Sequence, residues 1–158
     1  MPPLTEASLQ FRLATKNDLA TIVQMLADDT LGAAREKPMD EVSDRYITAF
    51  DKITADPNQE LTVVEMNGEV VATFQLSFIQ YLTYQGGIRA QIEAVRTHSS
   101  YRGLGIGTRV FEYAINRARE KGCHIVQLTS DKKRPDAIRF YESLGFRATH
   151  EGMKLIVT

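Results

Sequence analysis

The chain of 158 residues is poor in cysteine, tryptophan and long apolar runs. Its single cysteine, Cys123, excludes an internal disulfide and a cysteine-rich metal site, and the three histidines lack metal-ligand spacing, so we expect no metal. No apolar stretch approaches the roughly 20 residues that a membrane span needs. The first residues, Met1 to Leu4, lack the charged and then apolar pattern of a signal peptide. We therefore expect a cytoplasmic protein that makes no membrane contact.

An excess of charge of either sign is also missing. The chain has 19 Lys and Arg residues against 20 Asp and Glu residues, which gives a formal net charge of −1. Without a basic surplus to neutralise a phosphate backbone, direct nucleic-acid binding is not expected. The length suits one folding unit. We expect residues 1–158 to form a single domain with a core of about 9–157.

Hydrophobic periodicity in the first third of the chain predicts one strand and two helices. Alternation over 9–13 predicts a short strand, and helical spacing over 19–26 follows a capping box formed by Thr15 and Asp18. Residues 30–38 are expected to break the helical pattern. A second apolar stripe over 42–53 then predicts another helix, which ends before a proline.

Two β-rich runs, 61–66 and 70–79, are joined by Asn67-Gly68, a pair that tolerates the positive φ angles of a tight hairpin turn. We expect one face of the second run to be core and the other to be mixed. A further strand is predicted over 88–97. Strict alternation along it would place four residues on one face that could meet a substrate: Arg89, Gln91, Glu93 and Val95.

The last third of the chain alternates between helix and strand patterns. Residues 110–118 carry a helical stripe that Gly122 ends, and a strand follows at 125–129. A second helix is predicted from Pro135 to Leu144. Phe146 and residues 153–157 are expected to form final strands. Together these elements predict an α/β fold with one mixed, mostly antiparallel central sheet.

A glycine-rich loop, Arg102-Gly103-Leu104-Gly105-Ile106-Gly107, lies between a predicted strand and a predicted helix. Glycines let backbone N–H groups approach an anion, and the helix dipole favours a phosphate or pyrophosphate there. No lysine follows, as a nucleoside triphosphate loop would require. The third glycine of a dinucleotide fingerprint is displaced, because Thr108 or Val110 stands in its place.

Arg102, Gly105 and Gly107 instead match the pattern Q/R-x-x-G-x-G/A. With a second motif at 137–146, AIRFYESLGF, the chain resembles the GNAT superfamily of acyl-CoA-dependent N-acetyltransferases over nearly its whole length. The resemblance implies a single GNAT-like domain with six to seven strands, about four helices, and a splay between its fourth and fifth strands. It also implies an enzyme that uses acetyl-CoA as cosubstrate and acetylates a primary amine of an unidentified small molecule or protein.

The resemblance further implies which residues hold CoA. The backbone around Val95, Arg96 and Thr97 would receive the pantetheine arm, which adds to a free sheet edge as a strand does. Many relatives carry Asn where this chain has Arg134, so that contact is in doubt. Arg134 could instead meet the 3′-phosphate, or it could be a solvated loop charge. The pyrophosphate would be bound by the amides of the loop residues, which are Arg102, Gly103, Leu104, Gly105, Ile106, Gly107 and Thr108.

Two side chains are candidates for proton transfer. Amine attack needs a neutral nitrogen, yet a free alkyl amine has a pKa near 10.4, so a base is useful. Glu93 is the only carboxylate in 88–97 and could act directly or through a water from a partly buried position; otherwise it makes a cross-strand pair. The resemblance assigns the role of general acid to Tyr141, which could otherwise be a core aromatic. The backbone amide of Val95 is the expected oxyanion donor.

Other features leave alternatives open. Tyr81 and Tyr84 could line an acceptor pocket together with Gln91, could form a subunit contact in a homodimer, or could simply pack in the hairpin. An acidic group could attract a cationic amine or be a solvated face; it comprises Asp28, Asp29, Glu36, Asp40 and Glu41. The rival to an enzyme is a non-catalytic acyl-CoA-binding or transcription-regulatory module of the same fold. Propionyl or succinyl CoA is an alternative donor.

Overall fold

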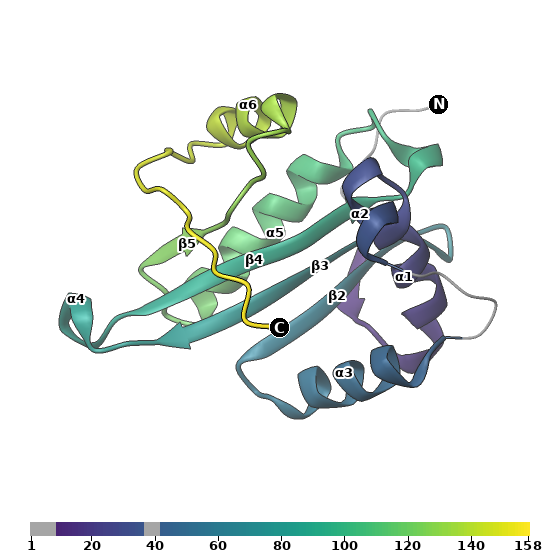
Figure 1. Ribbon diagram of the computed structural model, residues 1–158, viewed down its shortest axis with the longest axis horizontal. Helices are drawn as coiled ribbons and strands as arrows, with labels where there is room; N and C mark the ends of the chain where they lie inside the picture. Colours follow the sequence, from purple (N-terminus) through teal and green to yellow (C-terminus); the bar gives the residue numbers. More distant parts are fainter. Residues whose placement is uncertain (1–8, 37–41) are drawn as a thin grey trace.

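The computed structural model describes residues 9–36 and 42–158, which form one five-stranded sheet in the order β1-β2-β3-β4-β5 (Figure 1). The first four strands pair antiparallel, and β5 runs parallel to β4. The mixed, mostly antiparallel sheet that the sequence predicts is therefore confirmed. The strands are β1 (Gln10–Leu13), β2 (Gln59–Met66), β3 (Glu69–Gln80), β4 (Ile88–Thr97) and β5 (Ile125–Gln127).

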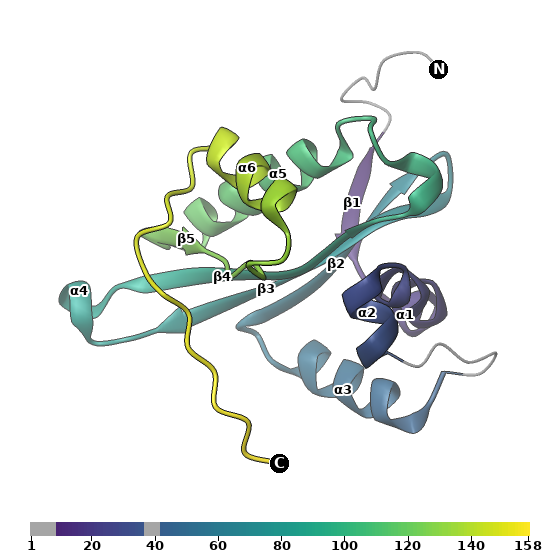
Figure 2. The same ribbon diagram turned by 45° about the horizontal axis from the view of Figure 1, so that its top comes forward.

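Helices cover both faces of this sheet (Figure 2). One face carries α1 (Leu19–Ala27), α2 (Thr30–Arg35) and α3 (Asp44–Ala55), and the other carries α5 (Ile106–Glu120) and α6 (Pro135–Ser143). Four of the described helices have nine residues or more, which agrees with the expected number. The short elements are η2 (Lys16–Asp18), α4 (Thr83–Gly86) and η3 (Ser99–Tyr101).

Two expectations about local structure are wrong. The segment expected to break the helical pattern forms α2 instead, because the Asp29 carboxylate caps it by accepting a hydrogen bond from the Gly32 N–H. The expected strands at Phe146 and 153–157 are absent, and β5 ends at Gln127. The sheet thus has five strands and not six or seven, because a strand needs a hydrogen-bonded neighbour and these C-terminal residues have none in the described chain.

Both faces of β3 are buried, although only one was expected to be core. Val71, Ala72, Phe74 and Leu76 are fully buried in the core beneath α5, and Thr73 is almost as deeply buried on the other face. Helices pack against each side, so the strand has no solvent face in its middle. The turn before β3 forms as predicted, with φ of 52° at Asn67 and 81° at Gly68.

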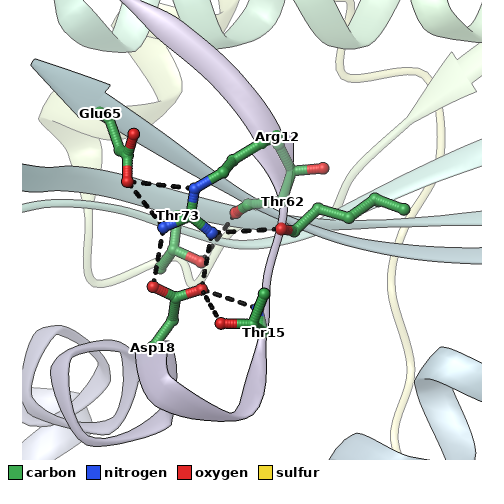
Figure 3. Close-up of polar contacts among 7 residues, drawn as sticks. Arg12, Thr15, Asp18, Thr62, Glu65 and Thr73 are labelled. Carbon is green, nitrogen blue, oxygen red and sulfur yellow. Dashed lines mark hydrogen bonds and ion pairs between the residues drawn. The ribbon is translucent and has the colours of Figure 1, made fainter. Parts of the chain in front are cut away.

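A buried ionic network fixes the first strand to the start of α1 (Figure 3). Arg12 Nη1 donates to Asp18 Oδ2 at 2.7 Å, and its Nη2 donates to Glu65 Oε1 at 2.7 Å. Asp18 also accepts a hydrogen bond from the backbone N–H of Thr15 at 2.7 Å, as the predicted capping box requires. The hydrogen bond from Arg12 holds the pKa of Asp18 below its ordinary value, even though burial acts in the opposite direction.

No described helix is both long and apolar enough to cross a membrane.

We predict that Asp18→Asn lowers the free energy of unfolding by about 1–3 kcal/mol at pH 7, because it removes a buried carboxylate that accepts charge-assisted hydrogen bonds from a partly buried guanidinium. The folded-state pKa of Asp18 is depressed, so its contribution is present above the unfolded pKa of about 4 and is lost as pH falls through the folded value. Urea unfolding at pH 7 and at pH 3 measures the difference, which should shrink at the lower pH.

The matched control is Asp51→Asn. Asp51 pairs with Lys16, but their side chains are 54% and 60% exposed, so the loss should stay below about 0.5 kcal/mol. An equal loss in both variants would show that the Arg12 network does not stabilise the fold specifically.

Candidate active site

The sheet opens between β4 and β5, as the resemblance implies. The two strands pair only through Arg89 to Gln91 on β4 and Ile125 to Gln127 on β5. Beyond Gln91, β4 continues to Thr97 without a strand partner on that side among the described residues. An edge without a strand partner can pair with an extended ligand that carries amides, in the way that a peptide adds to a sheet edge. The Val95 and Thr97 carbonyls on this stretch already accept hydrogen bonds from the side chains of Arg96 and Arg102.

A β-bulge interrupts β4 at the same place. Ala94 has a φ of 54°, in the left-handed region that a residue with a side chain seldom adopts, and the register with β3 shifts there. Glu93 lies opposite Gln75, and Arg96 lies opposite Thr73. Positions 73 and 75 point to the same side of β3, so Glu93 and Arg96 share a face despite their odd spacing.

The bulge corrects the expectation that Gln91, Glu93 and Val95 share one face. Val95 turns to the opposite side and packs against the core beneath α5. A bulge also leaves one residue outside the hydrogen-bonded ladder.

The glycine-rich loop meets this edge at the start of α5. Gly105 is the N-cap residue with a φ of 81°, and Gly103 has a φ of 77°. No atom lies within 4 Å of the point where a Cβ would stand at either residue, so the loop backbone is open to a ligand. Ile106 is 1% exposed and Leu104 packs against the core, so both side chains anchor the loop. The loop amides that follow Arg102 can therefore approach a pyrophosphate, whereas the Arg102 N–H donates to the Ser99 carbonyl at 3.5 Å.

The side chain of Arg102 holds the loop against its surroundings. Its Nε donates to the Thr97 carbonyl at 3.3 Å, and its Nη2 donates to the backbone and side-chain oxygens of Asp28 at 3.2 and 3.3 Å. The guanidinium thus joins the loop to the end of β4 and to the end of α1. Its role in the described structure is to position the loop.

Asp29 joins three elements in a second ionic contact. Its Oδ2 accepts a hydrogen bond from Arg134 Nη2 at 2.7 Å and lies 3.5 Å from Arg96 Nε. Burial raises the pKa of Asp29, but the Gly32 N–H, Arg96 and Arg134 outweigh it, and the net pKa is lowered. Arg134 is the N-cap residue of α6, so Asp29 connects α2, β4 and α6.

These contacts change the interpretation of the acidic group. Asp28 and Asp29 are engaged by arginines, and Glu36 accepts a hydrogen bond from the Tyr46 hydroxyl. Asp40 and Glu41 lie outside the described residues. The described acids are therefore not a free patch for a cation. This pairing could not be predicted from the sequence, because Arg134 lies 105 residues from Asp29.

Tyr141 lies on α6 and packs against Phe111, with ring centroids 5.4 Å apart. Burial raises the pKa of its phenol above the ordinary value, and the positive charges of Arg134 and Arg96 act in the opposite direction. The hydroxyl is therefore protonated at neutral pH. Glu93 is exposed and not partly buried as expected, so water can reach its carboxylate.

The other expected acceptor residues lie elsewhere. Tyr81 and Tyr84 form an aromatic cluster with His124 at the tip of the β3–β4 hairpin. Counted along β4 at about 3.3 Å per strand residue, that tip lies roughly 20 Å from Ala94. Gln91 accepts a hydrogen bond from Gln127 at 2.7 Å, which joins β4 to β5 just before they part. The structure therefore does not bring Tyr81 and Tyr84 to the opening.

A cavity that the sequence did not reveal lies beside the bulge. It has a volume of about 110 Å³, is open to solvent, and is bordered by α1, α3 and the sheet. Ala94 and Thr73 line it from the sheet, and its helical wall includes Leu19, Ile22 and Phe50. These helical residues follow ordinary apolar stripes, so their pattern predicts core packing and gives no sign of an open space.

The described residues give no support for a metal site or for a nucleophilic cysteine. They contain no group of three or more His, Cys, Asp or Glu side chains that could hold a metal ion. Cys123 is half-buried, and burial raises the pKa of its thiol. A thiol with a raised pKa is a poor nucleophile at neutral pH.

Comparison with known proteins decides the family. Residues 19–146 match the model of the acetyltransferase (GNAT) family. The chain belongs to the GNAT acetyltransferase family. A solved GNAT-like structure from Bacillus halodurans C-125, called a transcriptional regulator, is 52% identical, with a TM-score of 0.91 over 94% of this chain and 99% of that one.

Two curated relatives of this GNAT chain are N-acetyltransferases. Glucosamine 6-phosphate N-acetyltransferase of Trypanosoma brucei brucei is 36% identical over 56% of this chain and 58% of its own length. Aminoalkylphosphonate N-acetyltransferase of Salmonella typhimurium is 32% identical over 60% of this chain and 61% of its own length. The chain thus spans less than two thirds of each of these relatives.

Proposed function

We propose that this GNAT protein is an acetyl-CoA-dependent N-acetyltransferase that transfers acetyl directly to a primary amine. The observation that carries the proposal is the opening between β4 and β5 beside the glycine-rich loop. A free strand edge and an anion-binding helix start meet there, and these are the two features that an extended arm with a pyrophosphate needs.

The residues at this opening fit the cosubstrate. The loop amides from Gly103 to Thr108 would hold the pyrophosphate, and the backbone from Val95 to Thr97 would pair with the pantetheine arm. When bound, acetyl-CoA supplies an acetyl group activated as a thioester. In this proposal Arg134 does not hold the 3′-phosphate, because the shared carboxylate of Asp29 keeps its guanidinium on the side of Arg96.

Glu93 is the proposed base. It is exposed on β4 immediately before the bulge, where a water or an incoming ammonium can reach its carboxylate. It makes no ion pair among the described residues, so its charge is available to take a proton from the amine. The backbone N–H of Val95, displaced by the bulge, is the proposed donor to the acetyl carbonyl oxygen.

Tyr141 is the proposed acid. Burial raises its pKa, which keeps the proton on the hydroxyl until the sulfur leaves as a thiolate. Two arginines near the ring oppose this rise, so the phenol is not made inert by its apolar surroundings. The residue therefore keeps a stable proton that it can donate to the leaving sulfur.

The relatives support an amine as the acceptor. Glucosamine 6-phosphate and aminoalkylphosphonates, which their names give as substrates, are both small primary amines. The second candidate is a regulatory module that binds acyl-CoA without catalysis, which the name of the Bacillus halodurans protein favours. The net charge of −1 gives no support to direct DNA binding by such a module.

Release of free thiol from acetyl-CoA, measured against a panel of amino acids, aminophosphonates, amino sugars, polyamines and peptides, tests the proposal. An N-acetyltransferase releases thiol only when an acceptor is present and yields the N-acetyl product by mass spectrometry. Binding of CoA without release with any amine would favour the regulatory module. Propionyl and succinyl CoA in parallel define the acyl group.

We predict that Tyr141→Phe lowers kcat at least tenfold, or about 1.4 kcal/mol of barrier, with little change in the Kd for CoA. The variant removes the donating hydroxyl and keeps the ring against Phe111. Steady-state kinetics and CoA titration measure the two effects. Tyr113→Phe is the matched control, because burial also raises the pKa of Tyr113 but its ring stacks on Phe11, remote from the opening. Equal turnover in both variants would reduce Tyr141 to a packing residue.

We predict that Glu93→Gln removes the acidic limb of the pH–rate profile for kcat/KM, because the amide cannot take a proton from the acceptor. The profile is recorded with one acceptor between pH 5 and pH 9. Glu142→Gln, an exposed change on α6, should leave the limb intact. An unchanged limb in Glu93→Gln would assign the base to another group or to bulk water.

A further inference from the structure

A buried positive charge lies on the same face of β4 as Glu93. The Arg96 side chain is only 13% exposed, and its Nε makes no hydrogen bond although it is fully buried. Its Nη1 donates to the Val95 carbonyl at 2.9 Å. The nearest counter-charge is Asp29, and that carboxylate is shared with Arg134 at the shorter distance of 2.7 Å. One carboxylate thus serves two guanidiniums.

The local charge is in excess rather than balanced. Burial lowers the pKa of Arg96, the positive charges of Arg134 and Arg35 lower it further, and Asp29 opposes them. Two guanidiniums therefore share a single carboxylate, and the positive charge of Arg35 acts on Arg96 as well. An incompletely paired buried cation is unfavourable for folding, and an anionic ligand would relieve it. The two protein groups most suited to bind an oxyanion here are Arg96 and Arg134.

Three neighbouring positions around the bulge offer three different surfaces. Glu93 presents an exposed carboxylate, Ala94 lines the apolar cavity, and Arg96 presents the buried cation. The helical wall of the cavity is made of aliphatic and aromatic side chains from α1 and α3, among them Leu19 and Phe50, and Thr73 and Gln75 line it from β3. A molecule with an ammonium, an oxyanion and an apolar group would complement all three.

We propose that the acceptor is an amine that also carries an oxyanion and an apolar substituent, as a hydrophobic amino acid or its phosphonate analogue does. Arg96, supported by Arg134, binds the oxyanion, the amine faces Glu93, and the apolar group enters the cavity beside Ala94. This inference rests on the proposed N-acetyltransferase function and names the substrate class for the same site.

Matched acceptors test each part of this assignment in the wild-type protein. L-Leucine, its 1-aminophosphonate analogue, L-leucinamide and 3-methylbutylamine share one side chain, but only the first two carry an oxyanion. We expect kcat/KM to be at least tenfold higher for leucine or the phosphonate than for the two amines without an oxyanion; which of the two leads identifies the anionic group. Glycine, which lacks the apolar group, should be at least tenfold poorer than leucine. Equal or better use of leucinamide would overturn the proposal.

Arg96→Met removes the cation and keeps much of the side-chain volume. It should lower kcat/KM for leucine at least tenfold, change that for leucinamide less than threefold, and leave the KM for acetyl-CoA unchanged. Arg139→Gln, an exposed change on α6, should alter none of these values. A rise in the acetyl-CoA KM alone would assign the arginines to the cofactor and overturn the inference.

A binding measurement separates this inference from the proposed function. With CoA present, leucine should raise the melting temperature of the wild-type protein, and leucinamide should not. Arg96→Met should lose the leucine effect while keeping its own CoA-induced rise, which also shows that it folds. Leucine binding without acetyl transfer would contradict the proposed N-acetyltransferase activity but support the oxyanion site. Acetyl transfer without a preference for leucine would support the activity and contradict the oxyanion site.

A second and independent observation concerns the C-terminus. Residues 151–158 are all exposed and form no strand. Their apolar members are among the most exposed large side chains of the described chain: Met153 at 93%, Leu155 at 87%, Ile156 at 85% and Val157 at 85%. Figure 2 shows this segment passing β5 and extending away from the sheet. Four such residues in a row of five are unusual on a protein surface.

The same chain carries a free strand edge. β5 pairs with β4 on one side only, and Ile125 at its start is 46% exposed. An unpaired edge readily accepts another strand. Because the C-terminal segment leads away from its own β5, a second copy can supply the missing strand, and two-fold symmetry then satisfies both edges.

The geometry points to a homodimer in which residues 153–157 of each copy add as a strand to β5 of the other. Light scattering during size-exclusion chromatography should give the mass of a dimer for the full chain. Leu155→Lys combined with Val157→Lys should give a monomer, because the charges oppose burial of the strand. Leu82→Lys, on a 93% exposed residue at the hairpin tip, should leave the dimer intact.

A monomeric full chain would overturn this assembly, since the C-terminal segment would then remain free or return to its own β5. A dimer that survives removal of residues 153–158 would also overturn it. Dissociation by Leu82→Lys but not by the C-terminal variant would place the interface at the hairpin tip around Tyr84.

Discussion

The left-handed conformation of Ala94 is the constraint on which the rest of the opening depends. Holding a residue with a side chain in that region costs about 1–3 kcal/mol, so the surrounding structure must maintain it. Without the extra residue, alternation would put Arg96 on the face of Ala90 and Ile92, which are buried against α5. Because of the bulge, the Arg96 guanidinium lies on the face of Glu93, and Val95 packs against the core.

Asp29 makes this arrangement rigid. By capping α2 while it contacts Arg96 and Arg134, it holds the first helices over the end of β4 and joins them to α6. Asp28 does the same for the glycine-rich loop through Arg102. Two adjacent carboxylates at one helix junction therefore align the loop proposed to bind the cofactor with the face proposed to bind the acceptor.

Features that depend on neighbours in the sequence were predictable, whereas those that depend on distant partners were not. The Asn67-Gly68 turn and the glycine that ends α5 follow from local φ preferences and formed as expected. The β-bulge in β4 could not be predicted in this way, because an alanine in the sequence gives no signal for a positive φ. The predicted C-terminal strands are absent for a related reason. β propensity is a local property of the sequence, but a strand forms only beside a hydrogen-bonded partner. The distance of Tyr81 and Tyr84 from the opening was not predictable either. Sequence separation does not reveal how far the long β3–β4 hairpin carries its tip from the opening.

The two groups of positive charge at the opening need not compete for the same anion. The loop presents backbone amides and a helix start, which suffice for a pyrophosphate without a side-chain cation. Arg102, the cation nearest in sequence, is already used by the Thr97 carbonyl and Asp28. Arg96 and Arg134 stand apart from that contact and share only Asp29. Their excess charge is therefore left for a second anionic group, and in a two-substrate transfer the second molecule at this opening is the acceptor.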